Sequence, residues 1–240
     1  YHENAIIYIM SDKKTKQYIE ESTPFPKLNI KWFIELDEYS NMNREIMEQN
    51  GIWSNFQMSK ALIMKYALKY EEDTLFLDSD ILIMSEINDI DKNKTIGVSH
   101  HHIEEKYMDK YGIYNGGVLW SKDKNVPNDW IEFTKKSRYY DQASIEDLVK
   151  KYSYFQFGEN YNLQGWRYYL AKEGKQYISS NITSKMNDTL YYKNKPLKFI
   201  HTHFLNKTFM EFNNIIISHL KYAKLYKLLI IIYRIINNKW

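Results

Sequence analysis

Two carboxylates one residue apart, Asp78 and Asp80, are the pair of side chains in this chain best placed to do chemistry. They follow Leu75 to Leu77, an apolar run of strand length. In an extended chain, residues i and i+2 point to the same side, so the two carboxylates can converge on one point. Oxygen ligands placed in this way suit Mg²⁺ or Mn²⁺. The alternative is a polar turn after a core strand, which is a common use of aspartate.

A second pair of possible ligands, His201 and His203, lies in the alternating run 198–204. Alternation predicts a strand in which the two histidines share one face. Single histidines are more often structural than metal-binding, but a pair at this spacing beside two candidate carboxylates favours a mixed metal site. Residues 100–102 are also histidines, and we expect them in a loop because adjacent side chains diverge in an extended chain.

Asn115, Gly116 and Gly117 precede an apolar run that predicts a strand. Paired glycines at such a place indicate that another group approaches the backbone closely, or that the chain makes a turn or bulge. Beside a metal–phosphate site they would let a sugar pack against the main chain. Asp141 and Gln142 begin an amphipathic run, in which Asp141 is either a helix N-cap or, like Gln142, a hydrogen-bonding group of the site.

Lys60 interrupts the apolar stripe of a helix predicted at residues 55–70, for which Ser54 is the expected N-cap. Lysines in such stripes commonly extend their ammonium group into water. The alternative is that Lys60 points at an anion bound near the Asp pair.

The elements that must position these residues alternate between strand and helix, which predicts an α/β fold. Strands are predicted at 5–10, 29–36, 75–77, 81–87 and 95–99 and after Gly117, and helices at 15–21, 55–70, 127–140, from 141 onward and at 166–171. The carboxyl ends of strands in open α/β sheets are where such folds bind ligands. Asp78 and Asp80 follow the predicted strand 75–77, so they are expected at the edge of the sheet where such folds bind ligands.

Composition narrows the class of protein. The 240 residues suffice for one large domain or one domain with an extension. A net charge of +3, from 33 basic and 30 acidic residues, is too small to indicate a nucleic-acid partner. Cysteine is absent, so no disulfide or thiolate contributes. This absence and the polar residues 1–4, which do not resemble a signal peptide, lead us to expect a cytoplasmic protein.

The tail, residues 213–240, is basic and strongly apolar, with Lys221, Lys224 and Lys227 recurring every third position. This spacing predicts a basic ridge on one helix. Charges interrupt the apolar runs well short of the roughly 18–20 residues that a spanning helix needs. We expect the segment 215–236 to lie on an anionic membrane surface, with packing on the domain or an oligomer contact as the alternatives.

The order of these motifs resembles that of the GT-A glycosyltransferases, and most of all the family 8 group of glycogenin and the bacterial lipopolysaccharide galactosyltransferases. The resemblance covers most of residues 5–205. It implies a Rossmann-like mixed sheet flanked by helices over residues 1–212, followed by a helical tail. It also implies sugar transfer, with retention of configuration, from a nucleoside diphosphate sugar, with UDP-sugars favoured, to a hydroxyl of a glycan or glycolipid. Membrane attachment through the tail would place the protein peripherally on the inner face.

The same resemblance assigns roles by position. The implied Mn²⁺ (or Mg²⁺) ligands are Asp78, Asp80 and His201, with His203 as the rival of His201 and with the ribose as the alternative partner of Asp78. The implied donor-binding residues are Lys60, Asp78, Ser79, Asn115, Gly116, Gly117, Asp141 and Gln142. Asp141 and Gln142 would lie nearest the reacting carbon.

Two departures from the family pattern affect the nucleotide. The Ala-Asp pair and the following Tyr of the family's first strand have no counterpart here, and residues 6–10 look more like the family's second strand. Phe204 to Lys207 stands where the family has Gly and Lys-Pro. Two rival functions therefore remain open, namely a phosphotransferase of the haloacid-dehalogenase type, with Asp78 as nucleophile, and a non-catalytic nucleotide-sugar-binding protein.

Overall fold

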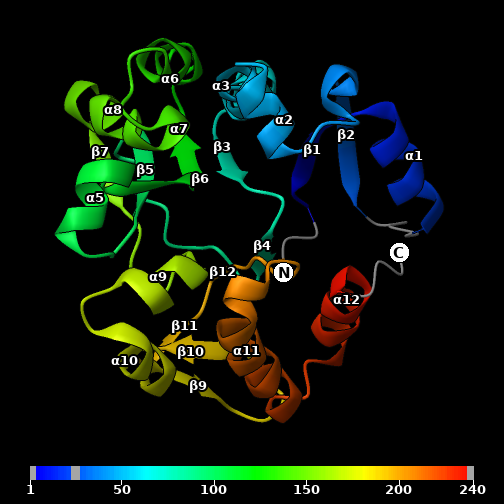
Figure 1. The fold of residues 1–240 in the computed structure, drawn as a ribbon, viewed down its shortest axis with the longest axis vertical. Coiled ribbons are helices and arrows are strands. Elements are labelled where there is room, and N and C mark those ends of the chain that lie inside the picture. Colours follow the sequence, from blue (N-terminus) through cyan, green and yellow to red (C-terminus); the bar gives the residue numbers. More distant parts are fainter. Residues whose placement is uncertain (1–3, 23–27, 237–240) are drawn as a thin grey trace.

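The computed structural model describes residues 4–22 and 28–236, and its fold is a mixed α/β arrangement of several sheets with helices packed around them (Figure 1). The α/β class predicted from the sequence is confirmed. Residues 1–3, which contributed to the expectation about a signal peptide, and residues 237–240 of the predicted tail lie outside the described residues.

The strands in chain order are β1 (Ile6–Ser11), β2 (Asn29–Ile34), β3 (Thr74–Leu77), β4 (Ile81–Ile83), β5 (Ile96–His100), β6 (Tyr114–Ser121), β7 (Tyr154–Gln156), β8 (Leu163–Gln164), β9 (Ile182–Ser184), β10 (Leu190–Tyr192), β11 (Lys195–Pro196) and β12 (Phe199–His201). The helices are α1 (Lys13–Ser22), α2 (Arg44–Gln49), α3 (Trp53–Gln57), α4 (Ser59–Ala67), α5 (Glu105–Tyr111), α6 (Val126–Thr134), α7 (Tyr140–Ala143), α8 (Ile145–Lys151), α9 (Gly165–Leu170), α10 (Gly174–Asn181), α11 (Met210–Tyr222) and α12 (Tyr226–Ile236), with 3₁₀ turns at Asp37–Tyr39 and Lys207–Phe209.

Four sheets are formed within the described residues. Strands β1 and β2 pair in parallel, and the largest sheet has the order β3-β6-β5-β7, with β6 antiparallel to both of its neighbours. A second mixed sheet, β4-β12-β8, crosses the middle of the molecule, and a small antiparallel sheet, β9-β10-β11, lies below it (Figure 1). The chain passes from the largest sheet to the central one through the turn between β3 and β4, where the Asp pair lies.

Two hydrophobic layers hold the largest sheet in place. Helices α4, α6 and α8 cover one face with side chains such as Met64, Trp130 and Leu148. On the other face, Val118 and Trp120 pack against aromatic residues of the loop after β7 and of β12. Burial of this kind contributes about 25 cal/mol for each Å² of apolar surface removed from water. The layers fix β6 and β12 on opposite sides of the Asp pair.

One predicted helix is divided in two. Residues 55–70 were expected to form a single helix, but α3 ends at Gln57 and α4 begins at Ser59. The Ser59 hydroxyl donates a hydrogen bond of 2.6 Å to the carbonyl of Phe56, a local bond of the kind that competes with regular helix geometry. Ser54 therefore lies inside α3 rather than at an N-cap.

Several predicted boundaries near the site are also wrong. Strand β6 begins at Tyr114, so the paired glycines lie within the strand and not before it. Strand β12 ends at His201, which leaves His203 beyond it. Strand β4 ends at Ile83, well before the predicted end at residue 87. Asp141 lies inside the short helix α7, for which Tyr139 occupies the N-cap position.

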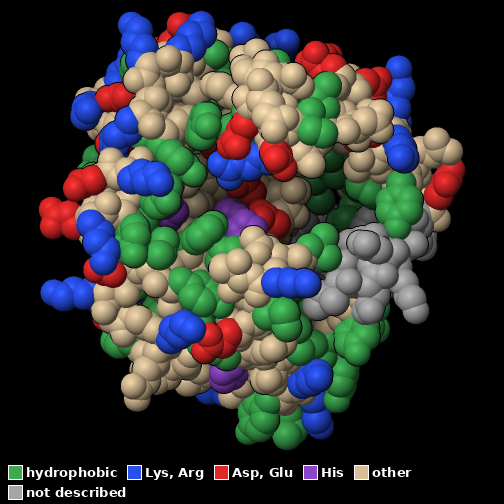
Figure 2. All heavy atoms as spheres, viewed as in Figure 1, with side chains coloured by type: hydrophobic (Ala, Val, Ile, Leu, Met, Phe, Trp, Pro, Cys, Tyr) green, Lys and Arg blue, Asp and Glu red, His purple; other side chains and the backbone are tan. Residues whose placement is uncertain are grey.

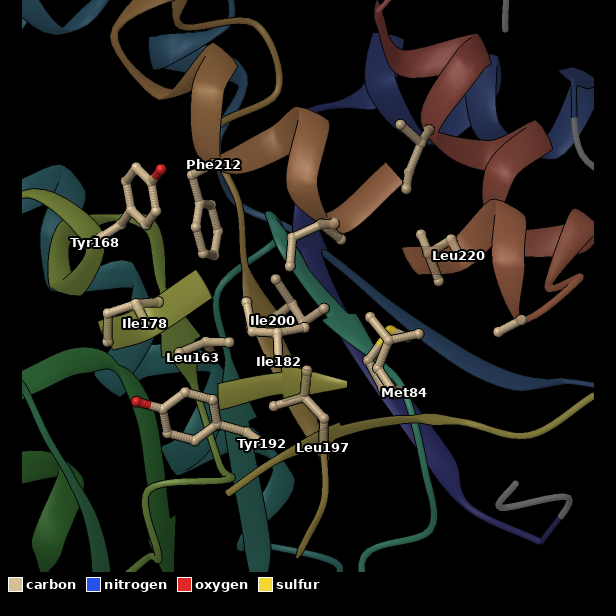
Figure 3. Close-up of a cluster of buried hydrophobic side chains, with 14 residues drawn as sticks. Met84, Leu163, Tyr168, Ile178, Ile182, Tyr192, Leu197, Ile200, Phe212 and Leu220 are labelled. Carbon is tan, nitrogen blue, oxygen red and sulfur yellow. The ribbon is translucent and has the colours of Figure 1, made fainter. Parts of the chain in front are cut away.

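The tail forms two helices instead of one, and both belong to the largest core cluster (Figure 3). Phe212 and Leu220 of α11 pack with strand residues such as Ile200, and Ile232 of α12 joins them. Lys224 adopts a left-handed backbone conformation (φ +57°), and α12 turns back beside α11 (Figure 1). The predicted lysine ridge is therefore divided among two helices and their connection. Within the described residues, no helix is long and apolar enough to cross a membrane.

Candidate functional site

Asp78 and Asp80 flank a tight turn rather than an extended segment. The amide of Ile81 donates to the carbonyl of Asp78 at 3.1 Å, which closes the turn, and Ser79 is exposed between the two carboxylates. The turn is held on both sides, because Asp78 N–H donates to the Gly117 carbonyl of β6 and the Asp80 carbonyl accepts from Thr202 N–H after β12. As a result, the two carboxylates take different partners.

Asp78 belongs to a buried cluster with Lys60 and Asp141. The Lys60 ammonium is 3.0 Å from Asp78 Oδ1 and 2.9 Å from Asp141 Oδ2, and it also donates to the Gly116 carbonyl. Burial alone would lower the pKa of Lys60, but the charges of Asp141 and Asp78 outweigh it and raise that pKa. Burial raises the pKa of Asp141 despite the attraction of Lys60. Lys60 therefore holds two carboxylates together and does not extend into water.

Asp80 belongs to a second group, with the two late histidines. His201 Nε2 lies 3.0 Å from Asp80 Oδ1, and His203 Nδ1 lies 3.1 Å from Asp80 Oδ2. Burial would raise the pKa of Asp80, but hydrogen bonds from both histidines outweigh it and hold the pKa well below its usual range. His203 thus joins His201 instead of replacing it. Asp78 adjoins the group, with its Oδ2 atom 3.9 Å from His201 Nε2.

The group of Asp80, His201 and His203 has the donor set of a metal site. Each residue offers one ligand atom, and these atoms lie within 4.8 Å of one another. One carboxylate and two imidazoles suit Mn²⁺, Fe²⁺ or Zn²⁺, whereas Mg²⁺ prefers oxygen ligands. Figure 2 shows histidine and acidic side chains gathered at a hollow near the middle of one face. A metal ion entering there would replace the hydrogen bonds that Asp80 now receives.

The two glycines of β6 make room for these charged groups. A Cβ atom on Gly116 would lie 2.5 Å from Asp141 Oδ2. One on Gly117 would lie 2.6 Å from His201 Cε1 and 2.7 Å from Asp78 Oδ2. Neither glycine has a positive φ, so the requirement is for space and not for an unusual backbone. The sequence signal of close approach was correct, and in this structure the approaching groups are protein side chains.

A network of buried polar side chains continues from Asn115. Its Oδ1 atom accepts from Gly117 N–H and from Asn162 Nδ2, both at 3.0 Å, and its Nδ2 atom lies 3.3 Å from His101 Nε2. Gln142 Nε2 donates to the Tyr111 carbonyl at 2.7 Å and lies 3.4 Å from His101 Nδ1. Asn115 and Gln142 are therefore fixed by protein partners, and they lie against the cluster of Lys60.

Three residues that sequence reasoning did not select belong to this neighbourhood. His101 lies in a loop after β5, as expected, but it is 4% exposed and contacts both Asn115 and Gln142, and burial lowers its pKa to about 4. Asn162 and Gln164 lie in the aromatic stretch 152–165, whose residues show no distinctive spacing. In the sequence, only the run of adjacent histidines indicated His101. Its contacts could not be predicted, because they come from distant residues of β6 and α7.

A cavity of about 280 Å³ lies elsewhere in the described part of the chain. It is lined by polar residues including His102, Glu159, Arg167 and Lys193. Glu159 Oε2 pairs with Arg167 at 3.0 Å and with Lys193 at 2.8 Å, so this carboxylate already has two protein cations as partners. The candidate functional site therefore consists of the groups around Asp80 and Lys60.

Comparisons with protein-family models, with curated proteins and with solved structures found no match to this chain.

Proposed function

We propose that this protein is a metal-dependent glycosyltransferase of the GT-A type, which transfers a sugar from a nucleoside diphosphate sugar to an acceptor hydroxyl. The observation that carries the proposal is the Asp80, His201 and His203 group at the turn after β3, next to the buried cluster of Lys60, Asp78 and Asp141. A divalent ion at the first group would neutralise charge that builds on the leaving diphosphate. Two imidazole ligands favour Mn²⁺ over Mg²⁺ in this role.

The chain's own residues would fix the reacting geometry. Lys60 lies 2.9 Å from Asp141 and favours its ionised form, which opposes the burial that raises the pKa of Asp141. Asp141 can then accept hydrogen bonds from sugar hydroxyls, and Gln142 and Asn115 define the neighbouring wall. Fixed hydrogen-bonding groups of this kind hold a substrate in reactive geometry without a further entropic cost at the moment of reaction.

Titration of UDP with and without Mn²⁺, followed by calorimetry, tests the proposal together with a turnover assay on UDP-sugars. We expect binding that depends on Mn²⁺ and is lost in His203→Ala, while Asp147→Ala, which removes a half-buried carboxylate paired with Lys150 on α8, leaves it unchanged. Absence of metal-dependent binding would refute the proposal. Binding without turnover would favour a binding protein, and phosphate release from simple phosphate esters would favour a phosphotransferase.

The tail supports a further proposal, that α12 rests on an anionic membrane surface. Ile232 and Leu229 turn one side of the helix toward the core. Tyr226, Ile230 and Tyr233 are exposed, and their i, i+4, i+7 spacing places them on one face. Exposed apolar and aromatic residues beside lysines are typical of helices that bind at the lipid interface. Sedimentation with vesicles of anionic or zwitterionic lipid tests this proposal.

A further inference from the structure

Gln164 is a buried amide with no visible role in folding. It ends β8 and is fully buried, yet neither its Nε2 nor its Oε1 atom has a hydrogen-bond partner among the described residues. Burial of an unpaired amide is costly, and such groups in folded proteins call for an explanation. An apolar side chain would fill the same space without that cost. The position therefore indicates a use for hydrogen-bonding capacity.

The strand register places Gln164 beside His201. Strands β8 and β12 are parallel, and Gln164 is the direct partner of His201, just as Leu163 is the partner of Ile200. Neighbouring residues on paired strands project to the same face of the sheet. Leu163 and Ile200 both point into the core cluster of Figure 3, so Gln164 and His201 share the opposite face.

His201 also has a buried nitrogen atom without a hydrogen-bond partner among the described residues. Its Nε2 atom faces Asp80 at 3.0 Å, whereas its Nδ1 atom is buried and has no partner within the described part of the chain. Without metal, Nε2–H donates to the Asp80 carboxylate, and in the neutral ring Nδ1 is then an acceptor. When Nε2 binds a metal ion, the proton of the neutral ring moves to Nδ1, which becomes a donor. A partner of Nδ1 must therefore serve both states.

We infer that Gln164 is a positioning residue for His201, and that rotation of its amide serves each state in turn. As the side chains lie in the structure, neither amide atom is bonded to Nδ1. Rotation of the Gln164 side chain would bring Nε2 to Nδ1 of the metal-free ring, or Oε1 to Nδ1–H of the metal-bound ring. Outer partners of this kind orient a ligating histidine, and their loss typically lowers metal affinity about 10–100-fold. The inference rests on the proposed metal site, and it adds Gln164 as the residue that orients the ligand His201.

Mn²⁺ affinity measured by calorimetry on the full chain tests the inference without any assay of activity. We expect Gln164→Met, which keeps the length of the side chain but removes both hydrogen-bonding atoms, to bind Mn²⁺ about 10–100-fold more weakly than wild type. Gln164→Glu retains an acceptor for the metal-bound state, so it should keep most of the affinity. Asn160→Leu, which removes a buried amide bonded to the Pro196 carbonyl, is the matched control and should leave affinity unchanged.

A spectroscopic readout separates positioning from simple packing. Nitrogen chemical shifts of His201, recorded with diamagnetic Zn²⁺, should show one neutral tautomer without metal and the other with it in wild type, and the Nδ1–H of the metal-bound ring should lose its hydrogen-bond shift in Gln164→Met. A folded Gln164→Met with wild-type Mn²⁺ affinity would overturn the inference and leave the proposed function standing. If Gln164→Met does not fold, loss of affinity in Gln164→Glu would overturn it. Failure of wild type to bind Mn²⁺ would overturn both.

Discussion

Removal of the buried ammonium group of Lys60 gives the sharpest test of how the site is held together. In Lys60→Met, the carboxylates of Asp78 and Asp141 lose a cation 3.0 Å and 2.9 Å away, and Asp141 is only 5% exposed. Breaking a buried ion pair on one side typically destabilises a protein by about 3–5 kcal/mol, because an uncompensated charge remains. We expect a loss in that range at pH 7.

Asp141 can take up a proton when Lys60 is removed, and the free energy of that protonation is the most that Asp141 can contribute to the loss of stability. Its pKa is already raised above the ordinary 3.8 by burial, and the loss of Lys60 would raise it further. Protonating a carboxyl of ordinary pKa costs about 4 kcal/mol at pH 7 and about 2 kcal/mol at pH 5. A group whose pKa is raised on folding contributes stability at low pH that is lost as the pH rises through the folded pKa. The deficit of Lys60→Met should therefore shrink between pH 7 and pH 5.

Urea unfolding at both pH values measures these changes. Lys65→Met, which removes an exposed lysine from the same helix, is the matched control and should change stability by less than about 0.5 kcal/mol. Asp141→Asn combined with Lys60→Met should recover much of the loss, because one buried charge is then removed with its partner. If Lys60→Met were as stable as Lys65→Met at pH 7, the electrostatic account of the site would be refuted.

Four further changes test other parts of the structure. Gly117→Ala should destabilise the protein by about 1–3 kcal/mol, because the added methyl group would displace His201, and an unchanged urea midpoint would contradict this. We expect Mn²⁺ to raise the melting temperature of wild type and Asp80→Ala to abolish that rise, and a retained rise would exclude Asp80 as a ligand. Burial lowers the pKa of His101 to about 4, so its protonation should reduce the free energy of unfolding by about 2 kcal/mol as the pH drops from 7 to 5. His101→Gln should flatten this pH dependence, and the same dependence in both proteins would contradict the role given to His101. Tyr226→Glu should weaken sedimentation with anionic vesicles, whereas equal binding of both proteins would argue against the membrane surface.

Local sequence determined the elements that carry the site. Apolar runs of strand length predicted β1, β2, β3 and β5, because a short run of β-forming residues bounded by polar ones has few alternatives. Spacing also brought His201 and His203 to one carboxylate, although the second lies past the end of its strand. The paired glycines correctly indicated close approach to the backbone. These features depend on residues within a few positions of one another.

The small sheet β9-β10-β11 was not predicted. Its strands have two or three residues each, which is too short for periodicity to distinguish them from loop. The division of the tail was likewise decided by tertiary packing. Lys224 turns the chain so that Ile232 can reach the core already formed by α11. A single helix would satisfy the local sequence equally well, but it could not bury both apolar segments.

The partners within the site were decided by tertiary structure alone. Lys60 meets Asp141, 81 positions further along the chain, because α4 and α7 both approach β6 at Gly116. His101 contacts Gln142, and Gln164 pairs in register with His201, through elements far apart in the chain. The sequence by itself supplied the carboxylates, histidines and glycines in a chemically suggestive order. Only the packed strands and helices decided which of them share a buried environment, because that environment is built from contacts between distant segments.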